Sequence, residues 1–392
     1  MRNKVIILAL VMVAFLCVKS LGCKGGDQKP KPTEEKKPTV IKVGVILPLT
    51  GDMAKYGQTI SAAVKLAADE LSKNPEPKNF TLDFIFEDDK IDPNTGVSAA
   101  MKLINADKVS AIIGPYASSV TLAVASVAER SQIVLLSPGS SSPKITDSGT
   151  FIFRNCVSDI YEGNEMAKFT NQNLKLKTLG ILYINNDFGV GLKDVFTKTI
   201  TDLGGSVKCA EAYEQGSTDF KTQLTRIKSC SPDAVYLVGY QEMAQIFKQA
   251  RELGLNKQLL ATTMLNDQSL VDKMGPKVAD GTIFAAWEYS PDSSNPRISS
   301  FVQRFKSFSG GMDPDVFAAN TYDAVFILNN AIKQAFEKTG NYNPTSIKDA
   351  LYNQSFDGVT GKTSFDQNGD VLKPIVIMTI KDGKITPYET SQ

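Results

Sequence analysis

Two short hydroxyl-rich segments carry the most evident chemistry of this chain, residues 114–121 (GPYASSVT) and 137–146 (SPGSSSPKIT). Each follows a short apolar run, at 111–113 and 133–136, that is typical of a buried strand. Ligands of open α/β sheets bind beyond the carboxyl ends of the strands. The hydroxyls available there belong to Ser118, Ser119, Ser141 and Ser142. One such segment alone is more typical of a turn or helix cap, but two at successive strand ends, with the free N–H groups of a helix start, indicate a cleft for an anion such as a carboxylate.

The chain has no histidine among its 392 residues. This excludes a Ser-His-Asp triad, a His-ligated zinc site and a histidine general base. Enzymes that use carboxylates, lysine or cysteine remain open, although a serine nucleophile would still need a base. The acidic run at 87–89 lacks the spacing of a calcium loop and favours a solvated loop. We therefore expect no catalytic residue, no metal and no cofactor.

The N-terminus predicts export. Arg2 and Lys4 precede an apolar run at 5–18, and the run ends shortly before Cys23. A basic start, a short apolar segment and a small residue before the cut describe a secretory signal. A cysteine at this point resembles the bacterial lipoprotein signal, in which that cysteine carries the lipid. We predict a signal peptide at 1–22 and lipidation at Cys23, with ordinary secretion or an uncleaved anchor as alternatives.

The segment that follows predicts a membrane tether. Residues 23–40 are polar and rich in Pro, Gly and charge, so they cannot bury a core. The protein is then an anchored lipoprotein facing the periplasm or the cell exterior, where disulfides are permitted. Cys209 lies on a predicted strand and Cys230 closes the following helix, which makes this pair a possible disulfide.

Composition and charge limit the partners. The chain is 42% hydrophobic and 22% charged, with a formal net charge of +1. Its length allows two lobes, each with a proper core. A nearly neutral balance without a basic block argues against nucleic acid as a partner. We expect a monomer that binds a small molecule.

The elements that position the two segments alternate between strand and helix. The first series has strands at 42–49, 82–86, 111–113 and 133–136, with helices between them. A second series begins after residue 154, with strands at 178–184, 206–213, 234–238, 258–261 and 282–286. We also predict a hairpin that joins 363–366 to 374–380. Strands that alternate with helices imply doubly wound parallel sheets, here in two lobes.

A family resemblance becomes clear in residues 43–57 (VGVILPLTGDMAKYG). This segment resembles the opening strand and loop of the leucine/isoleucine/valine-binding proteins, the substrate-binding components of ABC importers. Collinear similarity extends over 41–392. The resemblance implies a type I periplasmic binding fold: two Rossmann-like lobes joined by three crossovers, near 154–158, 285–288 and 366–372. The lobes would comprise, first, 41–156 with 287–368 and, second, 157–286 with 369–392.

The resemblance also implies roles for single residues. Ser118 should bind the ligand carboxylate, Gly139 should offer its carbonyl to the ligand ammonium, and Ser141 should serve both groups. Tyr56 should line the side-chain pocket, Phe188 should form an aromatic wall, and Tyr240 should lie near the carboxylate. The neighbouring hydroxyls of Ser119 and Ser140 belong to the same expected site.

One departure concerns the countercharge for the ammonium. Amino-acid binders of the family present a carboxylate after the strand near residue 260, and the matching position here is Thr263. Asp267 lies a little later and could take that role if the loop is shifted. If Asp267 does not, the ligand should be a small carboxylate or amide without an ammonium.

The main hypothesis is therefore a receptor that delivers an amino acid of the branched-chain type, or a related small carboxylate, to an ABC permease. A ligand sensor of the same fold, binding an amide or organic acid and signalling through a membrane partner, is the alternative. The fold does not separate these two functions.

Overall fold

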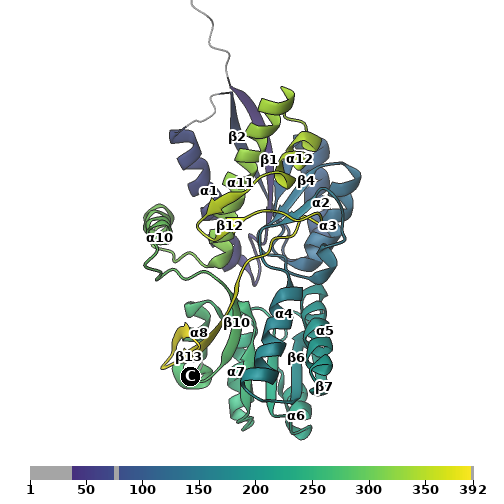
Figure 1. Cartoon of the computed structure of the whole chain (residues 1–392), viewed down its shortest axis with the longest axis vertical. Coiled ribbons are helices and arrows are strands. Elements are labelled where there is room, and N and C mark those ends of the chain that lie inside the picture. The colour runs from purple at the N-terminus through teal and green to yellow at the C-terminus, as the bar shows by residue number, and fades with distance from the viewer. Residues whose placement is uncertain (1–37, 75–78, 390–392) are drawn as a thin grey trace, which may run out of the picture. The chain divides into compact units, whose positions relative to one another are not determined.

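The computed structural model describes residues 38–74 and 79–389. The predicted signal peptide at 1–22, the lipidation site Cys23 and the tether up to residue 37 lie outside the described residues. In the described part, the strands form two large sheets and one two-stranded ribbon (Figure 1). Among the described helices, none is long and apolar enough to cross a membrane.

The first sheet has five parallel strands in the order β2-β1-β3-β4-β5. Buried on both faces, its central strands are short apolar runs, as is usual for parallel sheets. The strands are β1 (Thr39–Leu47), β2 (Phe80–Asp88), β3 (Ala111–Ile113), β4 (Val134–Ser137) and β5 (Ile152–Arg154).

Helices from two distant parts of the chain belong to this sheet. The early ones are α1 (Ala54–Lys73), α2 (Pro93–Lys102) and α3 (Ser118–Arg130), with a π-helical turn at Leu103–Asp107. The late ones are α10 (Pro296–Ser309), α11 (Val316–Thr339) and α12 (Pro344–Tyr352). Because α11 packs against α1 and α12 packs against β4, the late helices complete the lobe that the early strands begin (Figure 1).

The second sheet has seven strands in the order β14-β13-β10-β9-β8-β6-β7. Its strands are β6 (Thr178–Ile184), β7 (Ser206–Tyr213), β8 (Ala234–Val238), β9 (Gln258–Ala261), β10 (Ile283–Trp287), β13 (Ile375–Lys381) and β14 (Lys384–Pro387). Its helices are α4 (Asp159–Lys168), α5 (Asp187–Asp202), α6 (Lys221–Ser229), α7 (Met243–Glu252), α8 (Gln268–Met274) and α9 (Pro276–Ala279). Strands β6, β7, β8, β9 and β10 run parallel to one another, and β13 and β14 add an antiparallel edge beside β10.

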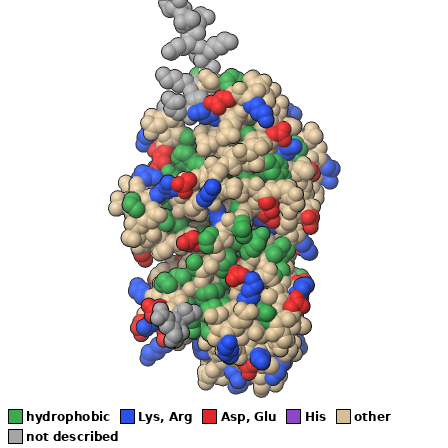
Figure 2. Space-filling view, viewed as in Figure 1, with side chains coloured by type: hydrophobic (Ala, Val, Ile, Leu, Met, Phe, Trp, Pro, Cys, Tyr) green, Lys and Arg blue, Asp and Glu red, His purple; other side chains and the backbone are tan. Residues whose placement is uncertain are grey.

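The chain passes between the two lobes after β5, after β10 and before β13. Two of these crossovers lie side by side, because Val157 and Val371 form a parallel bridge. Charged side chains of both signs are interspersed over the face in view, and hydrophobic side chains gather near its middle (Figure 2).

One prediction is wrong. The expected hairpin between 363–366 and 374–380 does not form, because β12 (Gly361–Thr363) pairs with β11 (Phe356–Gly358) and β13 pairs with β10 and β14. Only the turn itself is present, closed by a single bridge between Phe365 and Val371.

The sequence left open whether Cys209 and Cys230 form a disulfide. In the structure the two side chains meet as free thiols, and burial together with a hydrogen bond to Cys230 raises the pKa of Cys209 to about 12.

Candidate functional site

A small cavity lies where residues of both lobes meet. Its volume is about 10 Å³, roughly the room of one water. The first lobe contributes Tyr116, Ser118, Gly139, Ser141 and Phe317, and the second contributes Phe188, Tyr240, Thr263, Met264 and Trp287. Because any amino acid is larger than a water, the walls must separate before such a ligand can enter.

The first wall is polar and comes from two strand ends. Ser118 is the first residue of α3, so the N–H groups of its turn lack intrahelical acceptors. Its hydroxyl oxygen accepts a hydrogen bond from the backbone N–H of Ser142 at 3.1 Å, which leaves the hydroxyl proton free to be donated. Gly139 lies against Tyr116, because a Cβ at this position would be 2.9 Å from the tyrosine ring. With the Ser118 hydroxyl and the free N–H groups at the start of α3, this wall offers hydrogen-bond donors to an anion.

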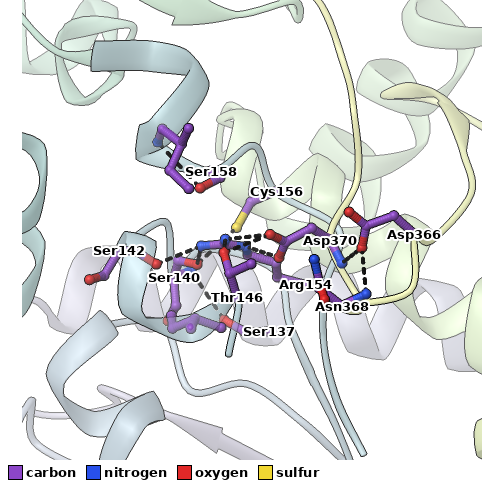
Figure 3. Close-up of polar contacts among 12 residues, drawn as sticks. Ser137, Ser140, Ser142, Thr146, Arg154, Cys156, Ser158, Asp366, Asn368 and Asp370 are labelled. Carbon is purple, nitrogen blue, oxygen red and sulfur yellow. Dashed lines mark hydrogen bonds and ion pairs between the residues drawn. The ribbon is translucent and has the colours of Figure 1, made fainter. Parts of the chain in front are cut away.

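A buried ion pair holds the segment that carries Ser141. Arg154 is fully buried and binds Asp370 at two points, with Nε to Oδ1 at 2.6 Å and an Nη atom to Oδ2 at 2.9 Å. Its guanidinium also donates to the carbonyl of Ser142 at 2.8 Å and to the hydroxyl of Thr146 at 2.8 Å. Figure 3 shows these side chains converging on the guanidinium. Arg154 therefore positions the binding loop between β4 and the short 3₁₀ turn Pro143–Ile145.

The second wall is aromatic. Phe188 lies in the first turn of α5, which Asn186 caps by accepting from the N–H of Gly189 at 3.0 Å. Tyr240 follows β8, and the two rings stack with centroids 5.2 Å apart and an interplanar angle of 13°. Burial raises the pKa of Tyr240, so its phenol keeps its proton and can donate a hydrogen bond. Such a wall suits an apolar side chain with one polar contact.

Four predicted site residues do not line the cavity. Ser140 is buried, and its hydroxyl bonds the carbonyl of Tyr116 at 2.9 Å and the hydroxyl of Thr121 at 2.7 Å, so it supports the loop. Ser119, the second residue of α3, is half-buried and does not line the cavity. Tyr56 packs behind Tyr116, with ring centroids 5.8 Å apart. The fourth residue is Asp267.

Asp267 does not stand in for the charge that Thr263 lacks. Its carboxylate pairs with Lys55 of α1 at 2.9 Å, accepts from the phenol of Tyr56 at 3.3 Å and caps α8 through the N–H of Ser269. Burial favours the neutral acid, but Lys55 and the hydrogen bonds from Ser269 outweigh it and lower the pKa of Asp267. The carboxylate of Asp267 therefore already has its hydrogen-bond and ion-pair partners, in a contact that joins the two lobes.

Sequence reasoning missed four residues of the cavity. Tyr116 lies inside the first hydroxyl-rich segment, so its position gave a usable signal. Trp287 was expected only at a crossover, yet its side chain reaches the cavity. Met264 and Phe317 come from a 3₁₀ turn after β9 and from the start of α11. Nothing local in the sequence shows that these two meet, because long-range packing brings them together.

Comparison with known proteins supports one family. The sequence matches the model of a periplasmic binding protein family over residues 40–384. It is 28% identical to the leucine-, isoleucine-, valine-, threonine- and alanine-binding protein of Pseudomonas aeruginosa, over 84% of this chain and 87% of that protein.

Two solved structures extend the comparison. A leucine-binding protein from Thermotoga maritima is 31% identical, with a TM-score of 0.81, and the match covers 89% of this chain and 98% of that one. A branched-chain amino acid transporter substrate-binding protein from Streptococcus pneumoniae, solved with isoleucine, is 26% identical with a TM-score of 0.79, over 88% of this chain and 98% of that one. The chain therefore belongs to the periplasmic binding protein family and has the type I fold of its leucine/isoleucine/valine-binding members.

Proposed function

We propose that this protein is the substrate-binding component of an ABC importer and that it binds an amino acid of the branched-chain type, or a related small carboxylate, between its lobes. The observation that carries the proposal is the cavity itself, which combines a serine wall with an aromatic wall. The names of the leucine-binding and isoleucine-bound relatives support the same ligand class.

The two walls suit the two ends of such a ligand. Ser118 and Ser141, with the N–H groups at the start of α3, receive the carboxylate, since a helix N-terminus favours an anion. Phe188 receives the aliphatic side chain, and the phenol of Tyr240, which keeps its proton, can donate to the carboxylate. The two lobes, divided as the sequence predicts except that Trp287 ends β10 of the second lobe, close over the ligand. The ligand favours the closed state through its contacts to both lobes.

Binding without turnover is the proposed activity. Ser141 and Lys144 do have the Ser-x-x-Lys spacing of some serine enzymes. The ammonium of Lys144, however, pairs with Asp187 at 2.8 Å, and its side chain is 61% exposed. Lys144 therefore serves as a surface partner of Asp187 and not as a buried base. Incubation with each bound amino acid, followed by mass spectrometry, should show the ligand unchanged, and product formation would contradict this.

Export and lipid anchoring at Cys23 complete the proposal. They place the receptor beside its membrane permease, as the importer role requires. The Cys23→Ala variant should leave the membrane fraction or accumulate unprocessed. Normal processing with full membrane retention in that variant would overturn the anchor.

Calorimetry with leucine, isoleucine and valine tests the cleft. Hydrogen bonds to a charged group are worth about 1.5–3 kcal/mol each, so Ser118→Ala should weaken binding about 10- to 150-fold. Ser119→Ala is a matched control one residue along α3, because that side chain does not line the cavity, and it should bind normally. Full affinity in both Ser118→Ala and Ser141→Ala would contradict the assignment.

A further inference from the structure

Two buried carboxyl groups lie directly behind the cavity, and the site as described so far does not use them. Asp159 and Glu162 both lie in the first turn of α4 and are fully buried. Neither oxygen of Asp159 makes a well-aligned hydrogen bond within the part of the chain that the structure describes, and the same holds for Oε2 of Glu162. The nearest donor to Asp159 is the hydroxyl of Ser141, which is close enough to oppose the rise of its pKa. Buried carboxylates are costly unless they are paired, so this pair needs an explanation.

Backbone contacts tie the pair to residues that line the cavity. The N–H of Asp159 donates to the carbonyl of Ser141 at 2.8 Å. Oε1 of Glu162 accepts from the N–H of Thr263 at 2.9 Å. The carboxyl of Glu162 thus reaches the backbone of the residue at which the family resemblance implies a carboxylate and this sequence has a threonine.

A third unpartnered group lies at the same place. The indole N–H of Trp287 is buried and lies near the carboxyl of Glu162, where it opposes the rise of the Glu162 pKa, but it makes no well-aligned hydrogen bond among the described residues. The backbone N–H of Trp287 donates to the hydroxyl of Thr263 at 3.2 Å. Unpartnered polar groups therefore gather around Thr263 from α4 and β10. This is the pattern expected where a ligand supplies the missing partners.

Neighbouring charges do not neutralise the pair. The cation near Asp159 is Arg154, which is already bound at two points to Asp370. Burial raises the pKa of Asp159 to about 7, while Ser141 and Arg154 oppose the rise. The pKa of Glu162 is also raised, mainly by burial and next by the charge of Asp159. Asp159 and Glu162 therefore cannot both be ionised unless a cation lies beside them. A proton bound to the pair removes one of the two charges, and a cationic ligand can replace that proton.

We propose that Glu162, together with Asp159, supplies the carboxylate that holds the ammonium of the ligand, in place of the side chain that Thr263 lacks. The countercharge has moved from the loop after β9 to the first turn of α4. The ligand is then a primary amine as well as a carboxylate, which separates amino acids from simple organic acids. This inference rests on the proposed function and deepens it.

Paired probes test the inference on the full chain. Calorimetry compares L-leucine, L-isoleucine and L-valine with the three carboxylic acids that lack only the amine. The wild type should prefer each amine-bearing partner by roughly 100-fold or more, since an unpaired buried charge is costly. Glu162→Gln should lose most of that preference while still binding the deaminated acid. The same preference in Glu162→Gln as in the wild type would overturn the inference, as would equal affinity of the wild type for both members of each pair.

Asp89→Asn is the matched control. Asp89 is also fully buried with one unpartnered oxygen, but it follows β2 and does not line the cavity. It should keep the wild-type preference, and loss of the preference there would reduce the Glu162 effect to general destabilisation and overturn the inference. If no probe binds the wild type, the proposed ligand class itself fails, and the inference falls with it.

A second measurement keeps the inference testable if Glu162→Gln does not fold. At neutral pH the binding of an ammonium should displace a proton from the acid pair, and calorimetry in two buffers of different ionisation enthalpy counts that proton. Release of a substantial fraction of one proton with the amino acid, and of none with its deaminated partner, is expected. Equal proton release with both ligands would overturn the inference.

Discussion

The two walls of the cleft differ in how their polar groups are satisfied. In the first wall, the hydroxyls of Ser137, Ser140 and Ser142 all bond backbone carbonyls, and Arg154 is paired with Asp370. In the second wall, Asp159 and Glu162 of α4 retain oxygens without a well-aligned hydrogen bond, next to the backbone of Ser141 and Thr263. The first wall is therefore preorganised, whereas the second is completed by what binds there.

This difference assigns separate tasks to the lobes. A preorganised wall holds an anion without rearranging, so it sets where the carboxylate lies. A wall with uncompensated acid groups gains most from a cation, so it selects ligands that carry an ammonium. Closure brings the two selections together, and only a ligand with both groups satisfies both walls.

The largest effect should come from breaking the preorganised wall. Arg154→Met leaves Asp370 as a buried charge without its partner, which costs about 3–5 kcal/mol of unfolding free energy. Denaturant unfolding should show this loss. Arg154→Met combined with Asp370→Leu should recover much of the stability, because no buried charge is then left alone. The double variant should still bind leucine weakly, since the carbonyl of Ser142 loses its donor. Wild-type affinity in the double variant would contradict the positioning role of Arg154.

A smaller effect should come from pH acting on the second wall. Burial raises the pKa of both acids, that of Asp159 to about 7. The pair therefore holds a proton at neutral pH and gains a second one at lower pH, and both compete with the ammonium. Affinity for leucine should fall by up to about tenfold per pH unit below pH 7. The stability of the unliganded protein should change in the opposite sense, falling as pH rises from about 4 to 7, because the folded state holds the extra proton.

Other titratable groups near the walls must be distinguished from Asp159 when leucine affinity is measured against pH. Burial raises the pKa of Cys156 to about 12 and also raises the pKa of Tyr236 and Tyr240, so these three stay protonated. Asp315, whose pKa burial raises to about 6, lies near Tyr116 and titrates in the same range. Asp159→Asn should therefore flatten the pH dependence of leucine affinity, while Asp315→Asn should not. A slope that survives Asp159→Asn would contradict the prediction.

The smallest effect should come from the contact at the edge of the cleft. Asp267→Asn removes the charge that Lys55 faces across the lobes, but the Lys55 side chain is 40% exposed. Exposed pairs contribute about 0.2–1 kcal/mol, so leucine affinity should fall less than about fivefold. Lys55→Met should give a similar result. A loss as large as that of Glu162→Gln would return the countercharge role to Asp267.

Much of the fold could be predicted from the sequence because buried parallel strands are continuous apolar runs. The bounds of β6, β7 and β8 match the prediction residue for residue. The C-terminal hairpin failed for the opposite reason. Its strands are partly exposed, and each has other partners: β12 pairs with β11 just before it, and β13 pairs with β14 just after it and with the distant β10.

Some residues of the candidate site could be predicted from local sequence patterns, and others could not. Ser118, Ser141, Phe188 and Tyr240 follow strand ends, a position that local patterns identify, and all four line the cavity. Glu162 and Phe317 lie on helices, where no local signal distinguishes a residue facing the ligand from one in the core. The packing of α4 and α11 decides their place, and the sequence does not show that packing directly.

A crystal structure of the protein with L-leucine would test the two-wall account most directly. The account predicts carboxylate oxygens at hydrogen-bond distance, about 2.7–3.2 Å, from Ser118 and Ser141. It predicts the leucine nitrogen at the same distance from the carbonyl of Gly139 and from the carboxylate of Glu162. A nitrogen bound without Glu162 and Asp159, or a carboxylate that contacts neither Ser118 nor Ser141, would contradict it.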